Sequence, residues 1–482
     1  MNLTEEQQQV VDTVCSIPDG RIIAVNAIAG SGKTSTGEAV IRAYKPKNGF
    51  YTAFNKAIVE DSKKRFGSLI DAKTVHALAY KYVKPTKSIE DLNYLTIKEN
   101  ISYEDKAIII DALDEFFRSS SVDIYDFAAT KTGNEKLQEL IADYANMMLE
   151  GKIPPTFNYM LKCLHIMLLH QEVEIDFDLL ILDECQDTTA VTLEIFKLIN
   201  AERKVMFGDK YQNIYSFMNT VNAFEELHDL NLLRLTKSFR CNPYIADIVD
   251  VYGQKYLEDD FIYAGNEDVE PTNTFQMAYI TRTNAMLIER MHNLLTKNQT
   301  FTLTRNVNEI FSLPMALLNA ANGKPVFDKK YKYLENEYKT FDQLRRSYRN
   351  FYEYINLIME DSLLESVTKM LMNFANKRID IYSLKNAVVK MQKERRENPN
   401  IVLTTAHAFK GLEMDSVFIE DDLNNSVNRT IQRMRELQPI ISAPEILDTK
   451  AFLSKEQKED LNTYYVALSR ARTAITNVGF VI

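Results

Sequence analysis

The stretch that decides the fold is VNAIAGSGKTST, from Val25 to Thr36. It follows the apolar, β-branched run RIIAVNA and leads into SGKTSTGEAVIRAY, whose apolar residues recur at helical spacing. A glycine-rich loop between a strand and a helix turns backbone N–H groups toward an anion, and the helix directs its positive end to the same place. The sequence therefore predicts a phosphate-binding loop at the carboxyl end of a strand.

Within this loop, Gly30 and Gly32 let the backbone turn around a phosphate, while Lys33 supplies positive charge. The Thr34 hydroxyl is placed to bind Mg2+. The strict form of the motif begins with glycine where this chain has Ala27, and a flexible strand-to-helix turn is the alternative interpretation. The loop residues expected to contact a nucleotide are Ala29, Gly30, Ser31, Gly32, Lys33, Thr34 and Ser35.

Two further apolar runs predict buried strands that end in acidic residues. FDLLILDE delivers Asp183 and Glu184, and KVMFGD ends at Asp209. Strands alternating with helices favour a parallel sheet with its chemistry at the carboxyl ends of the strands. Beside a phosphate loop, Asp183 would bind Mg2+ and Glu184 would act as the base for an attacking water, which predicts hydrolysis. A solvated turn is the alternative for this pair of acids.

The rest of the chain predicts an α/β protein with two parallel-sheet domains, each carrying a helical insert. Long amphipathic helices such as YEDKAIIIDALDEFFRS interrupt the first half, and strand signals return at FQMAYITRT and NIVLTTAHAF on either side of a second helical tract. The expected first domain covers residues 1–80 and 170–235, with residues 81–169 as its insert. The expected second domain covers residues 236–305 and 397–482, with residues 306–396 as its insert.

Composition limits the classes of function. The net charge of −10 does not suit a protein that coats nucleic acid by bulk electrostatics, so contact with nucleic acid would use a local groove and stacking. The sequence predicts no membrane-spanning segment, and the polar start MNLTEEQQQV does not resemble a secretory leader. We expect a cytoplasmic protein, associated with the nucleoid if the host is bacterial or viral. The four scattered cysteines are expected to be reduced.

Arginines in the second half suggest what the nucleotide is for. LTKSFRCNP places Arg240 next to Phe239, and YYVALSRAR places Arg470 near the end of the chain. Arginines from a separate domain that neutralise charge on a transferring phosphoryl group would make hydrolysis depend on domain closure. Surface arginines on helices are the alternative interpretation.

Taken in order, from LTEEQQQVV to YVALSRAR, these segments resemble the UvrD/Rep/PcrA type of superfamily 1A DNA helicases. YTAFNKAIVEDSKKRF and GDKYQNIYSF are most similar to the F-box DNA helicase branch. The resemblance implies two RecA-like domains that bind ATP and Mg2+, and an enzyme that uses ATP hydrolysis to move along single-stranded DNA and unwind duplexes. It also implies 3'-to-5' travel, which the motif chemistry alone does not fix.

The resemblance assigns a role to each candidate residue of the nucleotide site. The residues implied to be catalytic are Lys33, Asp183, Glu184, Gln212, Arg240 and Arg470, the two arginines acting as paired arginine fingers. Those implied to hold Mg2+ are Thr34 and Asp183. Those implied to contact the nucleotide outside the loop are Gln7 at the adenine edge, Gln186 and Gln212 at the γ-phosphate, Phe239 stacked on adenine and Glu413 at the ribose.

A second set is implied to form the track for single-stranded DNA. Its members are Phe54, Asn55, Lys56, Thr74, His76, Tyr215, Phe217, Thr405 and His407. Aromatic and imidazole faces stack on bases whatever their identity, so such a track grips a strand without reading its sequence. Core packing is the alternative for Phe54, Tyr215 and Phe217. Met218 stands where many relatives have a DNA-contacting arginine, which predicts a weaker grip there.

Other functions remain open at this level. A phosphate-loop kinase or GTPase would leave the distal arginines without a role, whereas an ATPase that strips proteins from DNA without unwinding would share the same motor. The expected partners are single-stranded DNA, junctions of single- and double-stranded DNA, and replication or recombination proteins, with no membrane. The protein is expected to act as a monomer. RRSYRNFYEY, from Arg345 to Tyr354, predicts an amphipathic helix in the short second insert, with DNA binding as its alternative.

Overall fold

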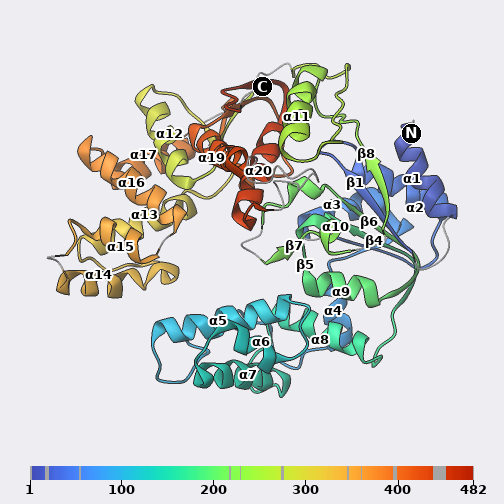
Figure 1. Ribbon diagram of the computed structural model, residues 1–482, viewed down its shortest axis with the longest axis horizontal. Coiled ribbons are helices and arrows are strands. Elements are labelled where there is room, and N and C mark those ends of the chain that lie inside the picture. The colour runs from blue at the N-terminus through green and yellow to red at the C-terminus, as the bar shows by residue number, and fades with distance from the viewer. Residues whose placement is uncertain are drawn as a thin grey trace. The chain divides into compact units, whose positions relative to one another are not determined.

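The computed structural model divides into two compact units, residues 1–238 and 239–482. It describes residues 3–16, 21–53, 56–215, 219–227, 230–272, 276–344, 347–359, 361–394, 399–437 and 452–480. Each unit contains a parallel β-sheet and a separate group of helices (Figure 1). The predicted fold class, α/β with two RecA-like parallel-sheet domains that each carry a helical insert, is confirmed. The first unit ends at Ser238, where we expected the first domain to end at residue 235.

The sheet of the first unit has six parallel strands in the order β3-β2-β4-β6-β1-β8. These strands are β1 (Ile22–Ala27), β2 (Gly49–Ala53), β3 (Asp71–Ala72), β4 (Asp176–Asp183), β6 (Asn200–Gly208) and β8 (Asn231–Leu235). The runs predicted as buried strands correspond to β1, β4 and β6, which lie side by side because apolar residues on both faces suit a central parallel strand. Because the three strands are parallel, the predicted phosphate loop after β1, the acidic pair at the end of β4 and Asp209 after β6 lie at the same edge of the sheet.

Helices cover both faces of this sheet. One core contains residues of α1 (Glu5–Ser16), α2 (Lys33–Tyr44) and α3 (Lys56–Phe66) packed on β1, β2, β4 and β6. The other core contains residues of α4 (Val75–Val83), α8 (Phe157–Leu169) and α9 (Ala190–Leu198) on the opposite face. The sheet is therefore the middle layer of three.

The helical insert of the first unit lies between α4 and β4. It contains α5 (Tyr103–Arg118), α6 (Ile124–Lys131), α7 (Glu135–Leu149) and α8, and Figure 1 shows α5, α6 and α7 grouped together away from the strands. On α5, residues Ile109, Leu113, Phe116 and Phe117 recur at helical spacing and are buried, which makes one apolar face. The GKIPPT segment separates α7 from α8, as its glycine and prolines predict.

The second unit has a five-stranded parallel sheet in the order β10-β11-β9-β12-β13. Its strands are β9 (Met277–Thr281), β10 (Thr302–Leu303), β11 (Ile401–Thr405), β12 (Met414–Ile419) and β13 (Ala471–Thr476). The accompanying helices are α11 (Pro243–Tyr256), α12 (Asn284–Thr296), α18 (Ala406–Phe409), α19 (Asp421–Leu437) and α20 (Lys455–Leu468). The same plan of strand and helix thus occurs twice along the chain.

The second group of helices lies between β10 and β11. It contains α13 (Val307–Ala321), α14 (Leu334–Gln343), α15 (Phe351–Met359), α16 (Ser362–Asn376) and α17 (Ile381–Glu394). The helix predicted over Arg345 to Tyr354 is wrong in its first part, because residues 347–350 are not helical and α15 begins at Phe351. Asn350 accepts a hydrogen bond from the backbone N–H of Glu353 at 2.9 Å, which favours a helix start at this point.

No helix among the described residues is both long and apolar enough to cross a membrane.

Candidate nucleotide site and candidate DNA track

The phosphate loop has the backbone conformation that its glycines predict. Gly30 and Gly32 adopt positive φ angles of 77° and 82°, which glycine accepts without steric cost, and Gly32 is the N-cap of α2. Ala27 is the last residue of β1 and is fully buried, so the position where the strict motif has glycine is ordinary strand here. Ser238 donates a hydrogen bond to the carbonyl of Ala29 at 2.8 Å, which ties the loop to the end of the first unit.

Lys33 lies among three carboxylates at the carboxyl edge of the sheet. Its Nζ atom pairs with Glu184 Oε2 at 2.9 Å. Burial lowers the pKa of Lys33, but Glu184, Asp183 and Asp209 outweigh it and raise this pKa above its usual range. Lys33 is therefore a fixed positive charge, as a phosphate ligand must be.

Asp183 and Glu184 are adjacent in sequence but have different environments. Asp183 is 4% exposed at the end of β4, and its Oδ1 atom accepts the backbone N–H of Glu184 at 2.9 Å. Burial and the neighbouring Glu184 raise the pKa of Asp183, although Lys33 and Tyr51 partly oppose them. Glu184 has a positive φ of 52°, which ends the strand and turns its side chain toward Lys33. The strained backbone is typical of a functional position.

Gln186 and Gln212 belong to one hydrogen-bond network. Gln186 Nε2 donates to Glu184 Oε2 at 2.6 Å, and its Oε1 atom accepts the backbone N–H of Asp209 at 3.1 Å. Gln212 Nε2 donates to Asp209 Oδ2 at 2.8 Å. A Cβ atom on Gly208 would meet Gln186 Oε1 at 2.5 Å, so only glycine allows this approach. The network joins the ends of β4 and β6 around the acidic pair.

Gln7 lies against the loop from α1. It is 4% exposed, its Nε2 atom donates to the carbonyl of Ser31 at 3.3 Å, and its Oε1 atom accepts the backbone N–H of Thr4 at 3.1 Å. Ser35 lies in the first turn of α2, where its hydroxyl accepts a hydrogen bond from Arg65 at 2.7 Å. Gln7 therefore contacts the predicted phosphate loop directly, while Gln186 and Gln212 are linked to the acidic pair through the network around Asp209.

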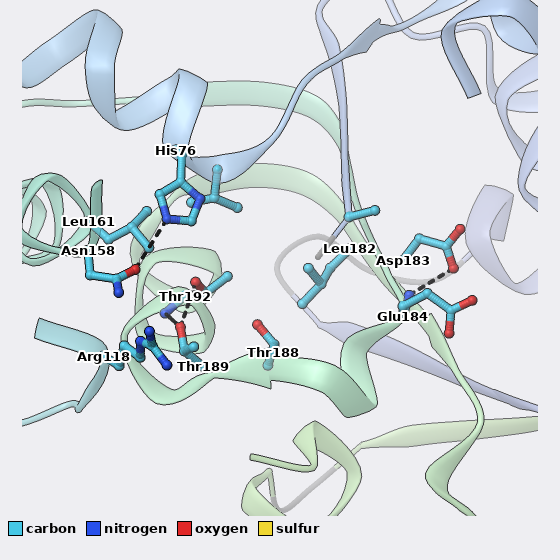
Figure 2. Close-up of a pocket in the computed structure, with 12 residues that line it drawn as sticks. His76, Arg118, Asn158, Leu161, Leu182, Asp183, Glu184, Thr188, Thr189 and Thr192 are labelled. Atoms are coloured by element: carbon cyan, nitrogen blue, oxygen red, sulfur yellow. Dashed lines mark hydrogen bonds between the residues drawn. The ribbon is translucent and has the colours of Figure 1, made fainter. Parts of the chain in front are cut away.

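A cavity of about 170 Å³ lies beside the acidic pair, on the side of α4 and α8 (Figure 2). Asp183 and Glu184 border one part of it, and His76 borders another. His76 Nε2 is 3.5 Å from Asn158 Oδ1, and Asn158 Nδ2 donates to Asp114 at 2.7 Å. Burial lowers the pKa of His76, which favours its neutral form. The structure thus places a predicted track residue next to the insert and near the acids.

The two predicted arginines of the second unit, Arg240 and Arg470, both contact Ser469. Arg240 Nε donates to Glu413 Oε2 at 2.7 Å, and another of its guanidinium nitrogens donates to the Ser469 carbonyl at 3.0 Å. Arg470 donates to the Ser469 hydroxyl at 2.9 Å and to the Val466 carbonyl at 2.9 Å. Two arginines that lie far apart in the sequence therefore belong to one cluster.

This cluster also shows features that the sequence did not indicate. Arg470 is 1% exposed, although the prediction of an arginine finger suggests a projecting side chain. Arg472, outside the predicted set, pairs with Asp415 at 2.8 Å and lies 3.8 Å from Glu413. Phe239 is 42% exposed, which suits a ring that stacks on a ligand.

Apart from Tyr215, the described residues of the candidate track lie at the ends of strands or in the first turns of helices. The Thr74 and Thr405 hydroxyls accept backbone N–H groups at the N-termini of α4 and α18, so both residues act as helix caps. Lys56 is the first residue of α3 and is exposed. His407 Nε2 lies 3.5 Å from Glu459, and Tyr215 is half-buried. Phe54, Asn55, Phe217 and Met218 lie outside the described residues.

The sequence assigned no role to two residues that contact the candidate nucleotide site in the structure, Tyr51 and Asp209. The Gly-Asp ending of β6 was a signal for Asp209, whose role becomes visible only through its bonds to the two glutamines. Tyr51 donates a hydrogen bond to Asp183 from the neighbouring strand. No local sequence motif predicts that contact, because it depends on the pairing of β2 with β4.

Comparisons with known proteins agree with this geometry. The model of the UvrD-like helicase C-terminal domain matches residues 189–477, and that of an AAA domain matches residues 7–218. The chain is 24% identical to F-box DNA helicase 1 of Gallus gallus over 98% of this chain and 49% of that protein. It is also 24% identical to F-box DNA helicase protein 1 of Schizosaccharomyces pombe, over 98% of this chain and 56% of that protein.

The chain thus spans about half the length of these curated relatives. The helicase model covers more than half of the chain and includes β9 to β13 together with the arginine cluster. The AAA domain match contains the predicted phosphate loop and the acidic pair, so each unit contains residues matched by a family model. The chain belongs to the UvrD-like helicase family.

Proposed function

We propose that this UvrD-like helicase hydrolyses ATP to move along single-stranded DNA and to unwind duplexes. The observation that carries the proposal is the placing of Lys33, Asp183 and Glu184 at one sheet edge directly beside a phosphate loop. A fixed cation with two differently held carboxylates supplies what hydrolysis of a nucleoside triphosphate needs. Both relatives are named DNA helicases, which supports DNA as the substrate.

The residues fit a bound nucleotide with Mg2+. The Ser31 hydroxyl is buried, with no hydrogen-bond partner among the residues that the structure describes, so it is available to a ligand. The positive φ angles of Gly30 and Gly32 and the N-terminus of α2 suit an anion at this place. Mg2+ in such sites is held by one or two carboxylates together with substrate phosphates, and it neutralises charge as the phosphoryl group departs.

Within this proposal, each residue has a separate task. Lys33 holds the outer phosphates, Thr34 and Asp183 are the Mg2+ ligands, and Glu184 takes the proton from the attacking water. Gln186 and Gln212 would sense the γ-phosphate, because their hydrogen bonds tie them to the base and to Asp209 at the end of β6. Glu184 accepts hydrogen bonds from both Lys33 and Gln186, which orient its carboxylate before substrate arrives.

We assign Arg240 and Arg470 to charge neutralisation on the transferring phosphoryl group, Phe239 to stacking on adenine and Glu413 to the ribose. Their shared bonds to Ser469 support the assignment of the two arginines as a pair. For DNA, the proposed contacts are Phe54, Asn55, Lys56, Thr74, His76, Tyr215, Phe217, Thr405 and His407. The proposed partners are single-stranded DNA and its junctions with duplex, and the proposed active form is a monomer.

The first test concerns the loop itself. Lys33→Ala is expected to lose nucleotide binding, because it removes the charge that faces the phosphates and leaves three carboxylates unopposed. Fluorescence titration with a labelled ATP analogue measures this. Lys197→Ala, at an exposed pair on α9, serves as the control with expected wild-type affinity. Equal affinities of wild type and Lys33→Ala would refute the phosphate-loop assignment.

The second test concerns direction and product. Unwinding is expected on duplexes with a 3' single-stranded tail, in keeping with the family resemblance. A strand-separation assay with matched 3'- and 5'-tailed duplexes reads out the direction. A parallel assay measures displacement of a protein bound to single-stranded DNA. Unwinding of 5'-tailed duplexes alone would show the polarity to be wrong, and displacement without strand separation would favour a protein-stripping ATPase.

A further inference from the structure

Tyr51 is a polar side chain in an apolar core. It lies in β2, is 2% exposed, and packs edge-on against Phe66 of α3 with ring centroids 5.1 Å apart. A buried phenol hydroxyl requires a hydrogen-bond partner, since leaving it unpaired destabilises the fold. A phenylalanine would fill the same space without that requirement, so the hydroxyl needs its own explanation.

The partner of this hydroxyl is the carboxylate of Asp183. Tyr51 donates to Asp183 Oδ2, while Ser62 of α3, also buried, hydrogen-bonds the same phenol oxygen. The other carboxylate oxygen, Oδ1, accepts the backbone N–H of Glu184 at 2.9 Å. Both oxygens of Asp183 are therefore fixed by protein donors. A carboxylate oxygen can accept more than one bond, so each retains a lone pair for a cation.

The sheet register explains why the residue is tyrosine. Ala53 is the Cα partner of Asp183 across the β2–β4 pair, and Tyr51 is the partner of Ile181. Side chains two residues apart on a strand share a face, so Tyr51 and Asp183 lie on the same side of the sheet. Two strand residues span roughly 6.6 Å, so a long side chain is needed to reach Asp183 from position 51.

We propose that Tyr51 is a positioning residue that holds the Asp183 carboxylate in the orientation that binds Mg2+. This inference rests on the proposed function and adds a residue to it. Carboxylates that bind metals are themselves held by hydrogen bonds, and loss of such an outer partner lowers metal affinity or activity about 10- to 100-fold. The alternative is that Tyr51 only fills the core next to Phe66.

Tyr51→Phe distinguishes a role in positioning Asp183 from a role in filling the core, because it keeps the ring and removes only the hydroxyl. The first measurement is the affinity for a fluorescent ADP analogue in excess EDTA, which is expected to equal that of the wild type. The second is the Mg2+ concentration that gives the half-maximal fluorescence change of the bound analogue, which is expected to rise about 10- to 100-fold. Tyr252→Phe is the matched control, since its buried hydroxyl donates to the Leu461 carbonyl in the second unit.

A double-mutant cycle assigns the effect to Asp183. Asp183→Asn is expected to weaken the Mg2+ response more than Tyr51→Phe does, and adding Tyr51→Phe to Asp183→Asn is expected to change nothing further. A wild-type Mg2+ midpoint in Tyr51→Phe would overturn the inference, as would an equal loss of analogue affinity with EDTA and with Mg2+. Failure of the wild type to bind the analogue under either condition would instead overturn the proposed nucleotide site itself.

Discussion

Glu184→Gln is expected to bind ATP at least as tightly as the wild type and to hydrolyse it about 10²- to 10⁴-fold more slowly, the range that a general base contributes. Glutamine keeps the shape of the side chain but cannot take a proton from water. The substitution also removes a negative charge next to Asp183 and frees Lys33 from its 2.9 Å ion pair, and both changes favour an anionic ligand.

Single-turnover hydrolysis and analogue binding, measured on the same preparation, check this expectation. Glu150→Gln is the matched control, because Glu150 is an exposed residue of the helical insert that pairs with Lys152. Near-normal turnover by Glu184→Gln would remove Glu184 from the role of base. A parallel loss of affinity and turnover would show that Glu184 organises the loop instead.

Arg240→Ala and Arg470→Ala are each expected to lower DNA-stimulated turnover on the order of 10³-fold or more while much of the nucleotide affinity remains. The reason is that an arginine finger acts on the charge that develops during transfer, more than on the bound ground state. Steady-state ATPase rates in saturating single-stranded DNA measure the effect. Arg433→Ala, at an exposed pair on α19, is the control.

Arg470 needs an additional control because its guanidinium also supports the fold. It donates to the Val466 carbonyl and the Ser469 hydroxyl, and a buried acceptor left unpaired costs about 1–3 kcal/mol. Arg470→Lys keeps the charge but not the forked geometry, so its thermal unfolding is measured beside its turnover. A folded Arg470→Lys or Arg240→Ala with near-normal turnover would return that arginine to a structural role.

The sequence predicted the parts of the fold that depend on local pattern. Continuous apolar runs indicated β1, β4 and β6, and helical spacing indicated α2 and α5, because both signals are present within about a dozen residues. The predicted start of the helix that contains α15 was wrong. Its cap, Asn350, lies inside RRSYRNFYEY, and the aromatic and cationic residues before it gave a helical pattern that the backbone does not follow.

The candidate site was predictable where a motif carries the chemistry, as for Lys33, Asp183 and Glu184. It was not predictable where the contact depends on strand pairing, as for Tyr51, or on burial, as for Arg470. Spacing along the chain does not state which side chains meet across a sheet or which carbonyls an arginine reaches. The hydroxyls of Thr74 and Thr405 show a further limit, since helix capping and a role in DNA binding use the same residue type.

The proposed DNA-dependent hydrolysis is tested most directly by the ATPase rate of the chain with Mg2+, measured with and without single-stranded DNA. We expect hydrolysis that rises strongly with single-stranded DNA and that is lost in Glu184→Gln. A rate that is the same with and without DNA, or that persists in Glu184→Gln, would contradict it.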